Sequence, residues 1–310
     1  MADDELERFK SDIALHEYAA HVGYELDKAE SGRREMVMRH GSDKISIRKD
    51  ADGHYVFYSF RDASDHGTII DFVMSRQSKN MGETRKVLRL WSGTDRLPLY
   101  EPLEAAPKFD RDLVQAEFAK AKPLGWHDYL ENERKIPRSV LTSTRFKGCL
   151  RVDRRGNVIF PHADAEGICG FEKRNRGFKG FADLGQKALW RSVGLGGDSV
   201  LVIAEGTIDC LSHAALFPSA ATRYASFAGG LSELQEALIA EECRRMPPGS
   251  EIVSITHPDA EGERYNEVIR LAAGSLPFRV HRPDGVKDWN DALRARHGPA
   301  SEAISFPAVL

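Results

Sequence analysis

Residues 200–211 read VLVIAEGTIDCL: an apolar run, then Glu-Gly, then a segment with helical spacing. The run from Ser199 to Ala204 has the length and composition of a strand that is buried on both faces. The order of strand and helix then repeats; the predicted helices are Thr207 to Phe217, Leu231 to Cys243 and Ala260 to Ala273, and the further strands are Tyr224 to Phe227, Glu251 to Thr256 and Phe278 to His281. This alternation predicts an α/β domain with a mainly parallel sheet and helices on both faces.

Acidic residues follow two of the predicted strands. Glu205 comes directly after the first strand, and His257-Pro258-Asp259 follows the strand that ends at Thr256. In an open parallel sheet, ligands bind at the C-terminal ends of the strands. A carboxylate at a buried strand end is costly to desolvate unless it is hydrogen-bonded or binds a cation. The pair therefore suggests a site for a hard metal ion, although either acid could instead cap the helix that follows it.

Four segments in this region resemble, in the correct order, the elements of the TOPRIM domain, which has a Rossmann-like fold. They are VLVIAEGTIDCL at Val200 to Leu211, ASFAGG at Ala225 to Gly230, IVSITHPDAEGER at Ile252 to Arg264 and KDWND at Lys287 to Asp291. The resemblance covers about Ser199 to Leu293. It implies a divalent cation, Mg²⁺ or Mn²⁺, held by Glu205, Asp259 and Asp288, with Glu205 as general acid/base.

One position departs from the family's pattern. His257 stands where the family has the first residue of an Asp-x-Asp pair. Neutral imidazole is a poor ligand for Mg²⁺ and a better one for Mn²⁺ or softer ions. The site could use Mn²⁺, His257 could carry a proton in catalysis, or catalysis could be weakened or lost. Asp209, one turn after Glu205, is either an outer-sphere acid or a structural residue at a helix N-terminus.

The middle of the chain is similar to the core of bacterial primases. VIFPHADAEGICGFEKR at Val158 to Arg174 resembles a primase-core segment, and WHDYLENERKIP at Trp126 to Pro137 resembles an element of primase-like proteins carried on plasmids and other mobile elements. The resemblance implies a group of cations that contact template phosphates or a nucleoside triphosphate: Lys173, Arg174, Arg176, Lys179 and, in the C-terminal domain, Lys287. The alternative for the group before the acidic sheet is a solvated basic loop.

The N-terminal segment from Arg34 to Met74 resembles the zinc ribbon that opens bacterial primases, but it contains no cysteine ligands. We therefore expect a small ribbon-like domain without zinc. Basic residues alternate there with Tyr55, Phe57, Tyr58 and Phe60, a combination that suits single-stranded nucleic acid. The alternative is that half of these aromatic side chains form the domain's own core.

Composition limits the class of protein. The chain has 310 residues, a formal net charge of −3 and four widely spaced cysteines, so neither a wholly basic nucleic-acid binder nor a disulfide framework is expected. The N-terminus MADDELERFK is acidic, which is unlike a signal peptide, and the expected location is cytoplasmic, with no membrane partner. We predict three regions: 1–95 is ribbon-like, 108–197 is an α+β primase-core-like region, and 198–310 is the TOPRIM domain.

The resemblance as a whole implies a primase-like protein that makes short primers by metal-dependent nucleotidyl transfer. Its expected partners are single-stranded DNA, nucleoside triphosphates and a helicase or relaxase that acts in trans. Two alternatives stay open. The same kind of site could cleave phosphodiester bonds as a nuclease, or the chain could be a catalytically silent DNA-binding module of a replication or conjugation system.

Overall fold

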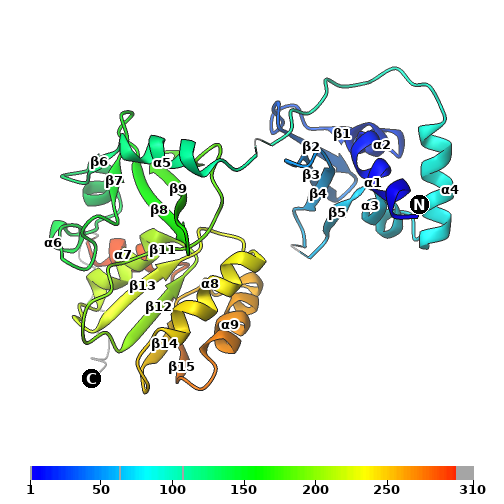
Figure 1. Ribbon diagram of the computed structural model, residues 1–310. Helices are drawn as coiled ribbons and strands as arrows, with labels where there is room; N and C mark the ends of the chain where they lie inside the picture. The colour runs from blue at the N-terminus through cyan, green and yellow to red at the C-terminus, as the bar shows by residue number, and fades with distance from the viewer. Residues whose placement is uncertain (1, 63, 107, 298–310) are drawn as a thin grey trace. The chain divides into compact units, whose positions relative to one another are not determined.

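The computed structural model describes residues 2–62, 64–106 and 108–297. The chain folds into two compact units, and the boundary between them lies between Lys108 and Phe109. Figure 1 shows the first in blue to cyan and the second in green to red. The regions predicted at 108–197 and 198–310 both lie in the second unit, and their division stays a prediction. Residues 298–310 lie outside the described residues.

The first unit is an antiparallel sheet with helices packed against it. Its strands are neighbours in chain order, from β1 to β5. The elements are α1 (Ala2–Asp12), α2 (Leu15–His21), β1 (Glu25–Leu26), β2 (Glu35–His40), β3 (Asp43–Lys49), β4 (Tyr55–Ser59), β5 (His66–Thr68), α3 (Ile69–Arg76) and α4 (Met81–Ser92).

Alternating side chains explain these strands. Ile45 and Ile47 on β3 and Phe57 on β4 point into one core, where the ring of Phe72 from α3 meets that of Phe57 edge to face. Met36 to Met38, Ile45 to Ile47 and Tyr55 to Tyr58 accordingly lie in the strands β2, β3 and β4. Helix α3 begins where Thr68 and Asp71 form a reciprocal capping box.

The aromatic residues of this sheet divide into two groups. Tyr55 and Phe57 are buried, whereas Tyr58 and Phe60 are 47% and 54% exposed. Part of the predicted stacking set therefore belongs to the core, and part remains on the surface.

A second antiparallel sheet opens the second unit, in the order β10-β9-β8-β7-β6. Its strands are β6 (Lys122–Pro123), β7 (Arg151–Val152), β8 (Val158–Asp164), β9 (Gly167–Asn175) and β10 (Phe178–Phe181), and α5 (Arg111–Ala119), α6 (Arg138–Leu141) and one turn of π-helix, η1 (Tyr129–Glu133), belong to the same region. Helix α5 packs Val114 and Phe118 against Phe171 of β9. In the π turn the Arg134 N–H donates to the Tyr129 carbonyl.

The third sheet is the predicted parallel one, in the order β11-β13-β12-β14-β15. Its elements are β11 (Trp190–Arg191), β12 (Val200–Ala204), α7 (Thr207–Leu216), β13 (Thr222–Ser226), α8 (Glu233–Arg244), β14 (Glu251–Ser254), α9 (Ala260–Ala273), β15 (Phe278–Val280) and α10 (Trp289–Arg296). Alternate residues of β12 face opposite cores: Val202 lies among residues of α7 and α10, and Leu201 lies among residues of α8 and α9. Helices therefore cover both faces, as predicted, with α8 and α9 together on one of them (Figure 1). The edge strand β11, which runs antiparallel to β13, was not predicted.

In the described part of the chain, no helix is both long and apolar enough to cross a membrane.

A buried histidine in β8 predicts how stability depends on pH. His162 is fully buried, with Nδ1 2.8 Å from the Ala188 carbonyl oxygen, and burial lowers its pKa from 6.5 to about 4. Between these pH values the unfolded chain binds a proton that the folded chain excludes, so stability falls as pH drops from 6.5 towards 4. The expected loss is about 3 kcal/mol.

Urea unfolding at pH 7, 6, 5 and 4 measures this loss. His162→Gln removes the titrating group, so the variant's unfolding free energy is expected to depend less on pH than that of the wild type. Parallel pH curves for the two proteins would show that His162 is not responsible.

Candidate metal centre

The parallel pairing of β12 and β14 brings the two predicted strand ends together. Ile203 pairs with Ser254, and the Ile255 N–H then donates to the Ile203 carbonyl at 2.9 Å. Glu205 and His257 follow these two strands at the same edge of the sheet. The backbone N–H of His257 donates to Glu205 Oε1 at 2.9 Å, and Glu205 Oε2 lies 3.3 Å from His257 Nδ1. The predicted strand-end site is thus assembled around Glu205 and His257.

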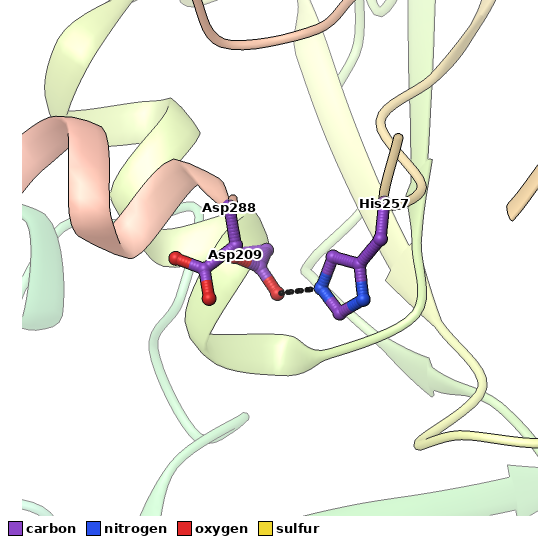
Figure 2. Close-up of side chains that lie close together, drawn as sticks. All are labelled: Asp209, His257 and Asp288. Atoms are coloured by element: carbon purple, nitrogen blue, oxygen red, sulfur yellow. Dashed lines mark ion pairs between the residues drawn. The ribbon is translucent and has the colours of Figure 1, made fainter. Parts of the chain in front are cut away.

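Two further carboxylates reach the other side of the imidazole. Asp209, in the first turn of α7, places Oδ2 3.7 Å from His257 Nε2. Asp288 is the N-cap residue of α10, where its Oδ1 accepts from the Asp291 N–H at 2.7 Å. Asp209, His257 and Asp288 each offer a ligand atom, and these atoms all lie within 4.8 Å of one another. Figure 2 shows the Asp209 carboxylate directed at the His257 ring, with Asp288 beside Asp209.

Burial and mutual attraction shape the charges in this cluster. Asp209 is buried, and that burial raises its pKa; burial also raises the pKa of Glu205. The Asp209 carboxylate raises the pKa of His257 to about 9. Glu205 acts in the same direction, whereas burial of the imidazole lowers the pKa. Asp209 Oδ1 and His257 Nε2 have no hydrogen-bond partner in the described structure, although both are buried. Buried polar atoms are normally satisfied, so these two atoms are candidate ligand atoms.

Asp259, predicted as a metal ligand, lies differently. It is exposed and is the N-cap residue of α9, where its Oδ1 accepts from the Gly262 N–H at 2.8 Å. Asp209, for which the sequence analysis allowed an outer-sphere or a structural role, lies in the cluster with His257 and Asp288. The signal in the sequence was its position one helical turn after Glu205, on the turn that faces the sheet edge.

Three of the predicted phosphate-binding cations are paired with acids. Lys173 lies 2.9 Å from Glu117, Arg174 pairs with Glu172, and Arg176 pairs with Glu133 and Asp128. Lys179 and Lys287 are exposed, and neither has an ion pair with another described residue. The predicted set is thus spread over several different electrostatic environments.

Asn290 connects two segments that the sequence treated separately. Its Nδ2 donates to the Arg134 carbonyl at 2.8 Å and to Ser212 Oγ at 3.0 Å, and its Oδ1 accepts from the Arg134 guanidinium at 3.2 Å. Because Asn290 is buried, these bonds hold the start of α10 against α7 and the π turn. They therefore position Asp288 beside Asp209.

Gly262 is required by a close approach of the backbone. A Cβ at this position would lie 1.9 Å from the carbonyl oxygen of His257. Gly262→Ala is therefore expected to displace the His257-Pro258 segment and to destabilise the protein by about 2 kcal/mol or more. Urea unfolding measures the effect. Gly230→Ala is the control, since a Cβ on Gly230 meets nothing within 4 Å; equal effects of the two changes would contradict the steric explanation.

Comparisons with known proteins agree with the fold of this region. Residues 202–293 match the family described as Toprim-like, and residues 128–199 match a family described as a protein of unknown function, DUF3991. No curated protein matches the chain. The C-terminal part of the second unit is thus a Toprim-like domain, which confirms the predicted fold class.

Two solved structures from bacteriophage T7 are similar to part of the chain. The primase fragment of the primase-helicase protein is 18% identical, with 54% of this chain and 69% of that chain covered and a TM-score of 0.41. A chain in the structure of the lagging-strand DNA polymerase interacting with primase domains, bound to an RNA/DNA hybrid and dTTP, is 21% identical, with 48% of this chain and 76% of that chain covered and a TM-score of 0.33.

Proposed function

We propose that this chain, through its Toprim-like domain, is a primase-like enzyme that joins nucleotides on a single-stranded DNA template with the help of a divalent cation. The observation that carries this proposal is the convergence of Glu205, Asp209, His257 and Asp288 at the C-terminal edge of the parallel sheet. Such an edge is where open α/β sheets bind their ligands.

The residues present fit one divalent cation. Bound in place of the imidazole proton, the cation would satisfy Asp209 Oδ1 and His257 Nε2, and a ligand atom of Asp288 lies within 4.8 Å of those of the other two residues. A donor set that includes imidazole suits Mn²⁺ better than Mg²⁺, which prefers oxygen ligands only. When bound, the cation would neutralise charge on the phosphoryl group that is transferred.

Glu205 is the proposed general base. Its Oε1 accepts from the His257 N–H, so the carboxylate is held in place and Oε2 is the oxygen that would take the proton of an attacking hydroxyl. Burial raises the pKa of Glu205, which makes its carboxylate a stronger base than an exposed one. Lys179 and Lys287 would contact phosphates, because neither is paired with an acid among the described residues.

The exposed face of the N-terminal sheet is the proposed surface for the template. Tyr58 and Phe60 are exposed there, Lys44 Nζ lies 4.2 Å from the Phe60 ring centroid, and the Arg48 guanidinium lies 6.0 Å from the Tyr58 ring centroid. Both cations are paired with acids, Lys44 with Glu30 and Arg48 with Glu35, so base stacking on the exposed rings carries this part of the proposal.

One observation favours a second candidate function. His257 itself lies between Glu205 and Asp209, so a protonated imidazole occupies the space between two acids. This arrangement suits a catalytically silent DNA-binding module that a helicase or relaxase recruits in trans. A nuclease would use the same carboxylates as a primase.

Primer synthesis on single-stranded DNA with labelled nucleotides tests the proposal, in Mg²⁺ and in Mn²⁺, with Glu205→Gln beside the wild type. We expect short products in Mn²⁺ that are lost in the variant. Degradation of a labelled strand in place of synthesis would support a nuclease. If neither synthesis nor degradation occurred while DNA binding was intact, the result would support the catalytically silent DNA-binding module.

A further inference from the structure

We propose that a groove between α5 and the strands β7 to β10 binds one nucleotide unit of a single-stranded nucleic acid, with its base on Phe178 and its phosphates on Arg154 and Arg155. This inference takes its choice of ligand from the proposed function. It concerns a different part of the second unit, and Arg154, Arg155 and Phe178 lie within the segment that matches a family of unknown function.

The groove has a volume of about 510 Å³, which lies within the range of small-ligand sites. Lys120, at the end of α5, forms one side of it. Arg154 and Arg155 belong to the turn between β7 and β8, and Lys173 and Phe178 come from β9 and β10. The groove is therefore built from one helix and three strand segments of the same sheet.

The charges in this groove are not balanced. Of its acids, Glu117 pairs with Lys173, and Asp153 accepts from the backbone of its own turn and from the Asn157 side chain. Lys120, Arg154 and Arg155 are exposed and have no ion-pair partner in the part of the chain that the structure describes. Lys120, Arg154 and Arg155 outnumber Asp153 and Asp183, the acids of the groove other than the paired Glu117, so the groove carries a net positive charge. An anionic ligand is expected to bind here.

Phe178 supplies an aromatic surface in the same groove. Phe178 is 46% exposed although it lies within a β-strand. Its ring lies close to Gly180, where an added Cβ would be 2.8 Å from the ring Cζ. Gly180 therefore leaves room for the ring along β10, and an exposed aromatic residue can stack on a base.

A single-stranded nucleic acid explains the cations and the exposed ring better than an acidic peptide does. Two consecutive arginines suit the repeated phosphates of a nucleic acid, and an exposed ring suits the flat base between them. By contrast, the cations predicted from the sequence, Arg174 and Arg176, are already paired with acids. The groove therefore offers unpaired cations in this region, in addition to Lys179 of the predicted set.

Fluorescence anisotropy of a labelled oligothymidylate, titrated with the full chain, tests the inference. R154Q/R155Q is expected to weaken binding at least about tenfold and to reduce the slope of log K against log salt by about 1.4, the value for two phosphate contacts on a single strand. Phe178→Ala is expected to weaken binding about tenfold, and Phe178→Trp to preserve it. The control R245Q/R270Q has the same charge change on α8 and α9 and is expected to stay within about twofold.

Thermal unfolding of each variant shows whether the variant is folded as stably as the wild type. An unchanged salt slope in R154Q/R155Q, or equal losses in the control, would overturn the inference. Displacement of the oligonucleotide by dTTP at equal nucleotide concentration would also overturn it, since the groove would then take a free nucleotide. Loss of synthesis in Glu205→Gln with binding retained separates the two proposals, because the groove acts in binding alone.

Discussion

Asp209→Asn is expected to reduce primer synthesis in Mn²⁺ by at least about 100-fold, since even residues that only support a metal ligand cost 10- to 100-fold. Asparagine has the same shape as aspartate but carries no charge. The carboxylate of Asp209 is buried, has one unpartnered oxygen and lies beside His257 and Asp288, so its charge is the natural counterpart of a cation. Product formation from labelled nucleotides and Mn²⁺ affinity by calorimetry measure the two effects.

Asp291→Asn is the matched control for this change. Asp291 lies three residues after Asp288 on the same helix, is 41% exposed and pairs weakly with Arg294 at 3.5 Å. Its substitution should leave synthesis and Mn²⁺ affinity nearly unchanged. If Asp209→Asn retained wild-type Mn²⁺ affinity, Asp209 would be a structural residue, and the cluster would not be a metal site.

The parallel sheet could be predicted because its signals are local. The strand β12 is a continuous apolar run, and each predicted helix has its own spacing, so the elements from β12 to β15 were confirmed, whereas α10 was not predicted. The edge strand β11 has two residues, Trp190 and Arg191, which is too short for any periodicity. Its place in the sheet comes only from its pairing with β13.

The composition of the metal cluster depends on contacts that a sequence does not show. Glu205 and His257 could be placed together because parallel strands end at one edge. Asp209 and Asp288 meet only because α7 and α10 pack on each other, a contact that the Asn290 bonds to Ser212 and Arg134 maintain. Asp259 follows a strand as Glu205 does, but the cap that it forms on α9 uses its carboxylate locally.

The basic residues show the same limit. Arg174 and Arg176 appear in the sequence as part of one cationic cluster, but their partners differ in origin. Glu172 is two residues away on the same strand, whereas Glu133 is in the π turn, 43 residues earlier. Whether a cation is available to a ligand depends on the position of such acids. The composition of its own segment therefore does not determine it.

The largest effect on stability is expected at a buried ion pair that joins three loops. Arg145 and Asp198 have side chains that are 8% and 7% exposed. The guanidinium donates to both carboxylate oxygens and also to the carbonyl oxygens of Val193 and Ala220. Asp198 additionally accepts from the Leu195 N–H at 2.9 Å. The pair thus fixes the segments before β12 and β13 to the chain that follows α6.

Asp198→Asn should therefore destabilise the protein by about 3–5 kcal/mol, because it leaves the Arg145 charge buried without a counter-charge. Urea unfolding measures the change, and Glu267→Gln provides the control at an exposed pair, where the loss should be below about 1 kcal/mol. R145M/D198L removes both charges and should recover most of the stability, since the cost comes from the unpaired charge rather than from the lost attraction. A double variant no more stable than Asp198→Asn would instead assign the loss to the hydrogen bonds that hold the three loops together.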